Sequence, residues 1–428
     1  MKGMRADMSE SGGAERRRVK LPAPIVLALI FLVAINLRPA LTSVGPLLPQ
    51  IGSDLFLDEG VLGFLGTIPL LAFALISPLV HHPARRFGME RTVLASLVLL
   101  AVGIVIRSYG GSAGLWVGAS IVGCAIAIGN VLTPTIVKRD YPARGALAMG
   151  IYSASVNIAA SSAAALAVPV ASTSGWRFSL AFWAIPATVV AFLWFPRARS
   201  SAPAQRFTSI TLDNSSASSA AGQSAHMGDK PATEVPLWKQ PTAWLVTAFM
   251  GLQSTTFYVL ATWLPTFLIT EGSTPAQAGM NLFVYQIVGV GGGLLIPALM
   301  RRPHSQTVAA ITASIPMIVT ICGLLIAPSL SILWAIIGGF GSGSSFVVAL
   351  SLINFRSHTP QDTTKLSGMA QSYGYLFAAI GPVAAGFLAE RTGAWTASFT
   401  LLGILACVQL LVGILVGPNR SMQQTQHA

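Results

Sequence analysis

The sequence predicts an all-α integral membrane protein in which twelve transmembrane helices form two pseudo-symmetric bundles of six. Three observations predict this class: a low charge content, twelve long apolar runs, and a polar segment near the middle of the chain. Only 9% of the 428 residues are charged and 53% are hydrophobic, and the mean hydropathy is +0.67. A soluble surface needs about 25–35% charged residues, so most of this chain is expected to lie in lipid.

The apolar runs define the predicted helices. A helix needs about 20 predominantly apolar residues to cross a bilayer, and charged residues, prolines and glycines separate twelve runs of that kind. The predicted spans are 23–49, 60–80, 92–109, 114–137, 146–171, 177–196, 242–270, 277–299, 307–327, 329–354, 366–389 and 395–416.

The first apolar run has a second interpretation, because Arg16, Arg17, Arg18 and Lys20 precede it as basic residues precede the core of a secretory signal peptide. No small-residue cleavage site follows cleanly, and eleven further runs come after it. We therefore expect an uncleaved first helix.

Basic residues predict the orientation, because they resist translocation and stay on the cytoplasmic side. Apart from Arg38, 22 of the 26 Lys and Arg residues fall on the side that holds the N-terminus, and Arg107, Arg177 and Arg391 fall opposite. The sequence thus predicts a multi-pass protein of a bacterial cytoplasmic (inner) membrane with both termini cytoplasmic. The same distribution accounts for the net charge of +12 without nucleic acid.

The polar segment at 197–240 is rich in Ser, Ala, Gly and Pro, which cannot bury a core, and we interpret it as a flexible cytoplasmic linker. The predicted organisation is a cytoplasmic tail (1–20), a six-helix bundle (21–196), the linker, a second six-helix bundle (241–417) and a cytoplasmic tail (418–428). Gly175-Trp176 opens the sixth run and Gly393-Ala394-Trp395 opens the twelfth, one of several matches that favour duplicated halves.

Two six-helix halves joined by a long loop resemble the major facilitator superfamily over about residues 20 to 417. Within it, the segments Asn36–Ala40 and Val44–Pro49, together with Gly251–Ser254, Thr262–Pro265 and Gly129–Pro134, resemble the cyanate and nitroimidazole permease branch, often called CynX/NimT. The resemblance implies a secondary transporter that works by alternating access.

Two departures limit what the resemblance implies. The superfamily usually carries an Asp three residues before a Gly in the loop between its second and third helices, whereas Arg85 takes that place before Gly88 here. The Gly-Pro pair typical of the fifth helix of drug/proton antiporters is missing from the fifth run, whereas Gly381-Pro382 lies in the eleventh. Proton-coupled multidrug efflux is therefore disfavoured.

Arg38 is the strongest candidate for solute binding. It lies within the first run, where a charged side chain costs at least about 2.5 to 3.5 kcal/mol and is usually turned toward a cavity or a partner. A guanidinium can bind a carboxylate or a similar planar anion in a bidentate manner. The structural alternative is an arginine bonded to backbone carbonyls that Pro39 frees.

Acidic and catalytic groups are missing from the apolar runs. No Asp, Glu or His falls in a confidently assigned apolar core, so an embedded acidic proton relay is not expected, and facilitated diffusion or exchange is favoured. The sequence offers no paired carboxylates, no metal-ligand cluster and no nucleophile with an adjacent base. We expect no catalytic residues, metal or cofactor, and we interpret Cys124, Cys322 and Cys407 as small buried hydrophobic residues.

Uncharged polar residues in the runs complete the predicted cavity, although an interhelical hydrogen bond is an equally good explanation of each. Gln371 and Tyr375 share a helical face, as do Asn281 and Tyr285. Alignment of the halves places Gln253 opposite Arg38, so we expect these two side chains to contact the solute together. The other predicted binding residues are Asn36, Asn130, Tyr152, Asn157, Tyr258 and Gln286.

The sequence therefore predicts a transporter, in monomeric form, of a small anionic or polar organic solute. Efflux of neutral, nitroimidazole-like compounds stays open as an alternative. A non-transporting membrane sensor is a third possibility, which the lack of a long soluble signalling domain disfavours. The partners implied are the solute and membrane lipid, with no nucleic acid.

Overall fold

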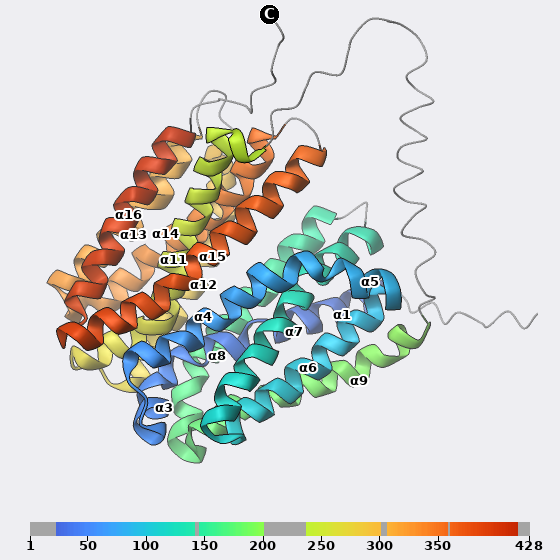
Figure 1. The fold of residues 1–428 in the computed structure, drawn as a ribbon, viewed down its shortest axis with the longest axis horizontal. Helices are drawn as coiled ribbons and strands as arrows, with labels where there is room; N and C mark the ends of the chain where they lie inside the picture. The colour runs from blue at the N-terminus through green and yellow to red at the C-terminus, as the bar shows by residue number, and fades with distance from the viewer. Residues whose placement is uncertain (1–22, 142–144, 201–236, 301–305, 358–359, 418–428) are drawn as a thin grey trace, which may run out of the picture.

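The computed structural model describes residues 23–141, 145–200, 237–300, 306–357 and 360–417. The predicted tails and most of the predicted linker lie outside these residues. The described part is built from helices, which form two groups (Figure 1). The helices of the first half are α1 (Ala23–Asn36), α2 (Pro39–Thr42), η1 (Gly45–Leu47), α3 (Leu48–Leu55), α4 (Glu59–Ile76), η2 (Ser77–Leu79), α5 (His81–Phe87), α6 (Met89–Tyr109), α7 (Gly111–Asp140), α8 (Gly145–Ala181) and α9 (Ala184–Ser200).

The second half repeats the plan with six long helices and two short 3-10 turns. Its elements are η4 (Leu237–Lys239), α11 (Pro241–Thr270), α12 (Pro275–Met300), α13 (Thr307–Ile326), η5 (Pro328–Leu330), α14 (Ser331–Arg356), α15 (Pro360–Thr392) and α16 (Thr396–Val416). These six helices begin and end within a few residues of the spans predicted from the sequence.

The twelve-helix fold is confirmed, although the described residues contain eleven stretches long and apolar enough to cross a membrane. One of them, Ile151–Ser200, has 50 residues, about twice the number that one crossing uses. Gly175 interrupts it with φ +80°, a backbone angle that suits glycine, and the chain turns there. This stretch therefore holds the predicted fifth and sixth spans.

The first predicted span is broken into pieces. Helix α1 ends at Asn36 and α2 begins at Pro39, which has no N–H to donate and restricts the backbone of the residue before it. Another short turn, η1, joins α2 to α3. We call residues 37–47 the first-helix break.

The two halves touch at one end of the molecule. Thr67 of α4 donates its hydroxyl proton to the Ala379 carbonyl of α15 at 2.5 Å, and the Gly60 amide donates to the Glu390 carboxylate at 3.1 Å. These contacts run from the first turn of α4 to its middle and involve the C-terminal part of α15. In Figure 1 the two groups of helices meet beside α3 and diverge toward α5. We call the end beside α3 the closed end.

A group of charged residues joins α6, α7 and α9 at the far end of the first half. Arg139 contacts Glu90 at 2.6 Å and Asp140 at 2.7 Å, and Arg197 pairs with Asp140. Burial by itself raises the pKa of Asp140, but the hydrogen bonds from Arg139 and Arg197 outweigh it, so this pKa lies below its usual value.

The prediction that the cysteines are buried is wrong for two of them. Cys322 on α13 and Cys407 on α16 are exposed on the outside of the helices, and Cys124 is partly exposed. In a membrane protein the outer face contacts hydrocarbon, so a small apolar side chain gains little from an inward position.

We predict that Asp140→Asn lowers the free energy of unfolding by about 1.5 to 3 kcal/mol at neutral pH, the range for hydrogen bonds to charged groups. Because folding lowers this pKa, the stabilisation is present above the unfolded value of about 4 and is lost as the pH falls below it. Thermal unfolding in detergent at neutral and acidic pH measures both effects.

The control is Asp54→Asn, which breaks an exposed ion pair with Arg177 at 2.6 Å. Exposed pairs contribute about 0.2 to 1 kcal/mol, so this variant should unfold nearly as the wild type does. Equal effects of the two substitutions would contradict a structural role for the Asp140 cluster.

Candidate functional site

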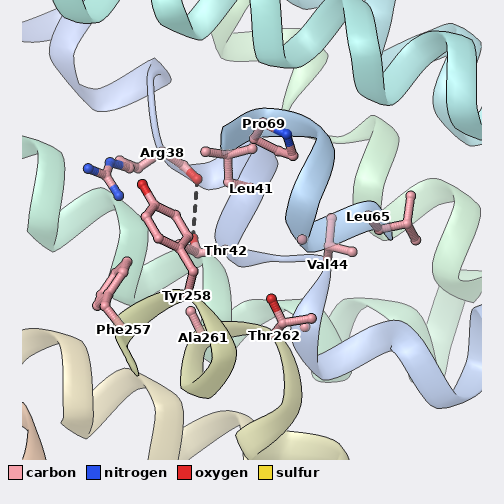
Figure 2. A pocket seen from close by; sticks show the side chains of 12 residues that line it. Arg38, Leu41, Thr42, Val44, Leu65, Pro69, Phe257, Tyr258, Ala261 and Thr262 are labelled. Carbon is pink, nitrogen blue, oxygen red and sulfur yellow. Dashed lines mark hydrogen bonds between the residues drawn. The ribbon is translucent and has the colours of Figure 1, made fainter. Parts of the chain in front are cut away.

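Arg38 lies in the first-helix break, immediately before Pro39. It is the N-cap residue of α2, with φ −113°. Its own carbonyl accepts the amide protons of Leu41 and Thr42, and the Thr42 hydroxyl oxygen lies 3.3 Å from it. The backbone of Arg38 is thereby fixed while its side chain extends away from the helix axis (Figure 2).

A cavity opens beside this side chain, between residues of both halves. The first half contributes residues from the first-helix break and from α4, and the second half contributes residues from α11 (Figure 2). The lining residues are Arg38, Leu41, Thr42, Val44, Gly45, Leu65, Gly66, Pro69, Phe257, Tyr258, Ala261 and Thr262.

Three tyrosines surround the Arg38 guanidinium. Tyr258 lies beside it, and the phenol groups of Tyr152 and Tyr375 are close enough to interact with it electrostatically. Figure 2 shows the Tyr258 hydroxyl directed toward the guanidinium. Tyr152 comes from the first half and the other two tyrosines come from the second. The structure thus brings three of the predicted binding residues around Arg38.

The charge of Arg38 has no acidic counter-charge in the described part of the protein. No carboxylate lies within ion-pair distance of it, and its buried Nε has no hydrogen-bond partner. An arginine side chain stays protonated in proteins and offers only donors. This side chain can therefore attract a group that is negatively charged or rich in acceptors.

The structural alternative for Arg38, hydrogen bonding to carbonyls near Pro39, is not what the structure has. Arg107 of α6 donates to the Ala40 carbonyl at 2.6 Å instead. The sequence predicts that Arg107 falls on the side opposite the termini. In the structure it lies in the last turn of α6 and is 2% exposed.

Four predicted binding residues use their amide groups within their own helices. Asn36 donates to the Leu32 carbonyl and Asn157 donates to the Ser153 carbonyl, each at 2.8 Å. The amide of Gln371 reaches Ser367 at 2.8 Å, and that of Gln253 reaches Ser254 at 2.7 Å. Gln253 is buried and is not among the residues that line the Arg38 cavity.

The remaining predicted polar residues lie elsewhere in the bundles. Asn281, Tyr285 and Gln286 of α12 are buried, and each keeps a polar atom without a hydrogen-bond partner. Tyr285 stacks near Phe257, with ring centroids 6.3 Å apart, so this group approaches the second-half wall of the cavity. Asn130 of α7 is partly exposed.

Sequence reasoning missed several residues of the cavity wall. Phe257 and Pro69 gave no signal, because an apolar residue in an apolar run cannot be distinguished from ordinary packing. Thr42 lies within the first predicted span but was not selected, and Thr262 was quoted only as part of a motif. Position in space, not residue type, distinguishes all of these.

Two six-helix halves around a central cavity are the architecture of secondary transporters, whose solute sites lie where the repeats meet. Residues 27–376 match the model of the Major Facilitator Superfamily. The chain belongs to this superfamily, and it is a membrane transporter and not an enzyme.

Relatives agree over nearly the full length. The chain is 37% identical to the uncharacterized transporter YycB of Bacillus subtilis, over 94% of this chain and 95% of that protein. It is 36% identical to the 2-nitroimidazole transporter of Escherichia coli, over 93% of this chain and 97% of that protein. It is 29% identical to the cyanate transport protein CynX of Escherichia coli, over 93% of this chain and 98% of that protein.

Solved structures agree with the fold. A crystal structure of a D-xylose-proton symporter superposes with a TM-score of 0.69 at 14% identity, covering 93% of this chain and 99% of that one. A crystal structure of a POT family transporter in complex with a thioalcohol-conjugated peptide superposes with a TM-score of 0.72 at 13% identity. It covers 91% of this chain and 95% of that one. At these identities the similarity concerns the fold alone.

We predict that Arg38→Met leaves the thermal stability of the protein unchanged or raises it. Removal of a partly buried charge that lacks an acidic partner relieves a desolvation cost. The measurement is the unfolding temperature of the purified variant in detergent. A fall of many degrees would instead indicate that Arg38 bonds to backbone carbonyls, the role that the structure gives to Arg107.

Proposed function

We propose that this transporter moves a small anionic organic solute, or a polar one rich in acceptors, across a bacterial cytoplasmic membrane by alternating access. Arg38 binds the negatively charged or acceptor group, and the surrounding tyrosines donate further hydrogen bonds. The observation that carries the proposal is the Arg38 guanidinium at a cavity between the halves, with no acidic counter-charge among the residues that the structure describes. A bound anion would supply that charge.

The aromatic wall of the cavity suits a solute with a flat apolar body. Phe257 and Tyr258 line it from α11, and Tyr375 lies near Arg38 in contact with Phe73, at a ring distance of 5.9 Å. Aromatic side chains pack well against planar groups. One relative over a quarter of this chain is described as a putative anionic 4-hydroxy-benzoate permease, which agrees with such a solute.

A second candidate function is export of neutral, drug-like compounds. The 2-nitroimidazole transporter, 36% identical over nearly the whole chain, favours it. In this case the nitro oxygens, which are acceptors, would take the place of a carboxylate at Arg38. The two candidates differ in how strongly binding depends on the charge of the solute.

The coupling we propose is facilitated diffusion or exchange. Proton-driven transporters generally relay protons through Asp, Glu or His inside the bundle, and the residues that line the Arg38 cavity include none of these. Solute uptake into proteoliposomes with and without an imposed pH gradient tests this coupling. A sensor without transport activity would give no flux in either case.

We also propose that the closed end faces the outside of the cell, with the predicted linker and both termini in the cytoplasm. The basic residues of the sequence carry this orientation. The conformation is then inward-facing, and transport requires the contacts between α4 and α15 to open.

We predict that 4-hydroxybenzoate raises the unfolding temperature of the purified wild-type protein and that 4-hydroxybenzamide, its uncharged analogue, does so far less, because a ligand that binds only the folded state stabilises it. Arg38→Ala should cost at least about 1.5 to 3 kcal/mol of benzoate binding, and Arg38→Lys should restore it only partly, because a planar fork becomes a point charge. Gln253→Ala should cost less.

The matched control is Arg177→Met, which removes a guanidinium from an exposed ion pair and should leave binding unchanged. Unchanged benzoate affinity in folded Arg38→Ala would reject the anion site. Equal affinity for the acid and the amide, or binding of 2-nitroimidazole alone, would favour the neutral-compound function.

We predict that Gly63→Val shifts the protein away from the conformation described here. A side chain at Gly63 would lie 2.7 Å from the Pro382 carbonyl oxygen and 2.8 Å from the Val383 Cα atom, so the halves cannot pack as they do at the closed end. Spin labels at Ser53 and Thr392 should move apart by several Å in pulsed electron-electron distance measurements.

The control is Gly291→Val on α12, where an added side chain meets open space. It should leave the label distance at the wild-type value. An unchanged distance in Gly63→Val would show that the backbones of α4 and α15 can separate locally without any opening of the closed end.

A further inference from the structure

We propose that Arg107 is a positioning residue: it holds the first-helix break in the shape that directs Arg38 into the cavity. The inference rests on the proposed role of Arg38 in solute binding. It goes beyond that role because Arg107 is not among the residues that line the cavity and would act only through the backbone of the break.

The break leaves a carbonyl without its usual helical partner. In a continuous helix the amide of Val44 would donate to the Ala40 carbonyl. Here the Val44 amide donates to the Leu41 carbonyl at 3.3 Å. A buried carbonyl without a donor is costly in lipid, where no water replaces the lost bond. Arg107 supplies the missing donor, at 2.6 Å through Nη1.

Arg107 is an unusual residue for this task. It is 2% exposed, and no ion pair joins it to a carboxylate in the described part of the chain. Its Nε and Nη2 have no hydrogen-bond partner. A buried charge in a membrane protein is costly and usually has a functional role. Here the long side chain reaches from α6 to the break.

The backbone of Arg107 is itself held tightly. Gly118 of α7 packs so closely that a Cβ atom there would overlap the backbone of Arg107. On the other side of the break, the Thr42 hydroxyl donates to the Ala160 carbonyl of α8 at 2.8 Å. The break is therefore held to α6 at Ala40 and to α8 at Thr42, and these bonds fix the backbone from which the Arg38 side chain extends.

Loss of Arg107 should redirect Arg38. Without it the Ala40 carbonyl has no donor, and Arg38, two residues away in the sequence, has a buried Nε without a hydrogen-bond partner. We expect Arg38 to turn from the cavity toward this carbonyl, since an unpaired buried acceptor is more costly than a lost contact with a solvated cavity.

The first measurement needs no solute. Phenylglyoxal modifies accessible guanidinium groups, and peptide mass spectrometry gives the rate at Arg38 in the purified full-length protein. We expect this rate to fall several-fold in Arg107→Met. In Arg107→Lys it should stay near the wild-type rate, because one N–H suffices for one carbonyl. The control Arg177→Met should match the wild type.

The second measurement uses 4-hydroxybenzoate as the probe. In a protein that keeps Arg38, Arg107→Met should weaken the affinity for 4-hydroxybenzoate at least about tenfold. In a protein that already carries Arg38→Met, adding Arg107→Met should not weaken this affinity further. Two residues that act through one another show this non-additivity. A purely structural role of Arg107 would lower stability in both backgrounds without rescue by lysine.

The outcomes separate the two proposals. If phenylglyoxal modifies Arg38 at the wild-type rate in folded Arg107→Met, the inference is overturned. A loss of affinity for 4-hydroxybenzoate without a change in this rate overturns it too. If wild-type protein binds no 4-hydroxybenzoate but Arg38 modification still depends on Arg107, the inference stands and the proposed anion fails. If Arg107→Met does not fold, Gly118→Ala takes its place, because the added methyl group pushes against the Arg107 backbone. We expect Gly118→Ala to slow the phenylglyoxal modification of Arg38. An unchanged rate there also overturns the inference.

Discussion

The first-helix break must keep its backbone polar groups bonded in a region without water, and the rest of the site depends on how it does so. A continuous helix bonds its own amides and carbonyls, whereas Pro39 ends that pattern. The short turns α2 and η1 restore most of the bonds. Arg107 and Thr42 make the connections from this segment to α6 and α8. Once these bonds are made, the segment has a defined shape, and Arg38 projects from it.

The two halves contribute different chemistry to the cavity. The first half supplies the charge, through Arg38, and the second supplies the phenol of Tyr258 and the ring of Phe257. The halves can approach because Gly63 of α4 faces the backbone of α15 and Gly386 of α15 faces the backbone of α4. A site divided between two rigid bodies changes when they move, and this is the physical basis of alternating access. The sequence similarity to bacterial transporters, at 29 to 37% over nearly the whole chain, is consistent with this arrangement.

Polar residues in the bundles serve more than one purpose. Gln409, which is fully buried, donates to Ser314 at 3.2 Å and to Ser345 at 3.0 Å, and so joins three helices of the second half. Several residues first considered for solute binding, Asn36 and Gln253 among them, bond within their own turns. A polar residue in an apolar run therefore does not by itself indicate a contact with the solute. Its partner depends on the neighbouring helices.

The sequence by itself determined the class, the twelve spans and the duplicated halves, because hydrocarbon imposes a length on each helix, and it singled out Arg38 as a candidate, because hydrocarbon imposes a cost on each charge. Only the tertiary structure decided which residues meet. It placed Tyr258 beside Arg38, assigned the Ala40 carbonyl to Arg107 and left Cys322 on the outer face. These contacts join residues far apart in the chain and depend on helix rotation and on close packing at single glycines. An apolar run specifies neither, since every face of it is compatible with lipid.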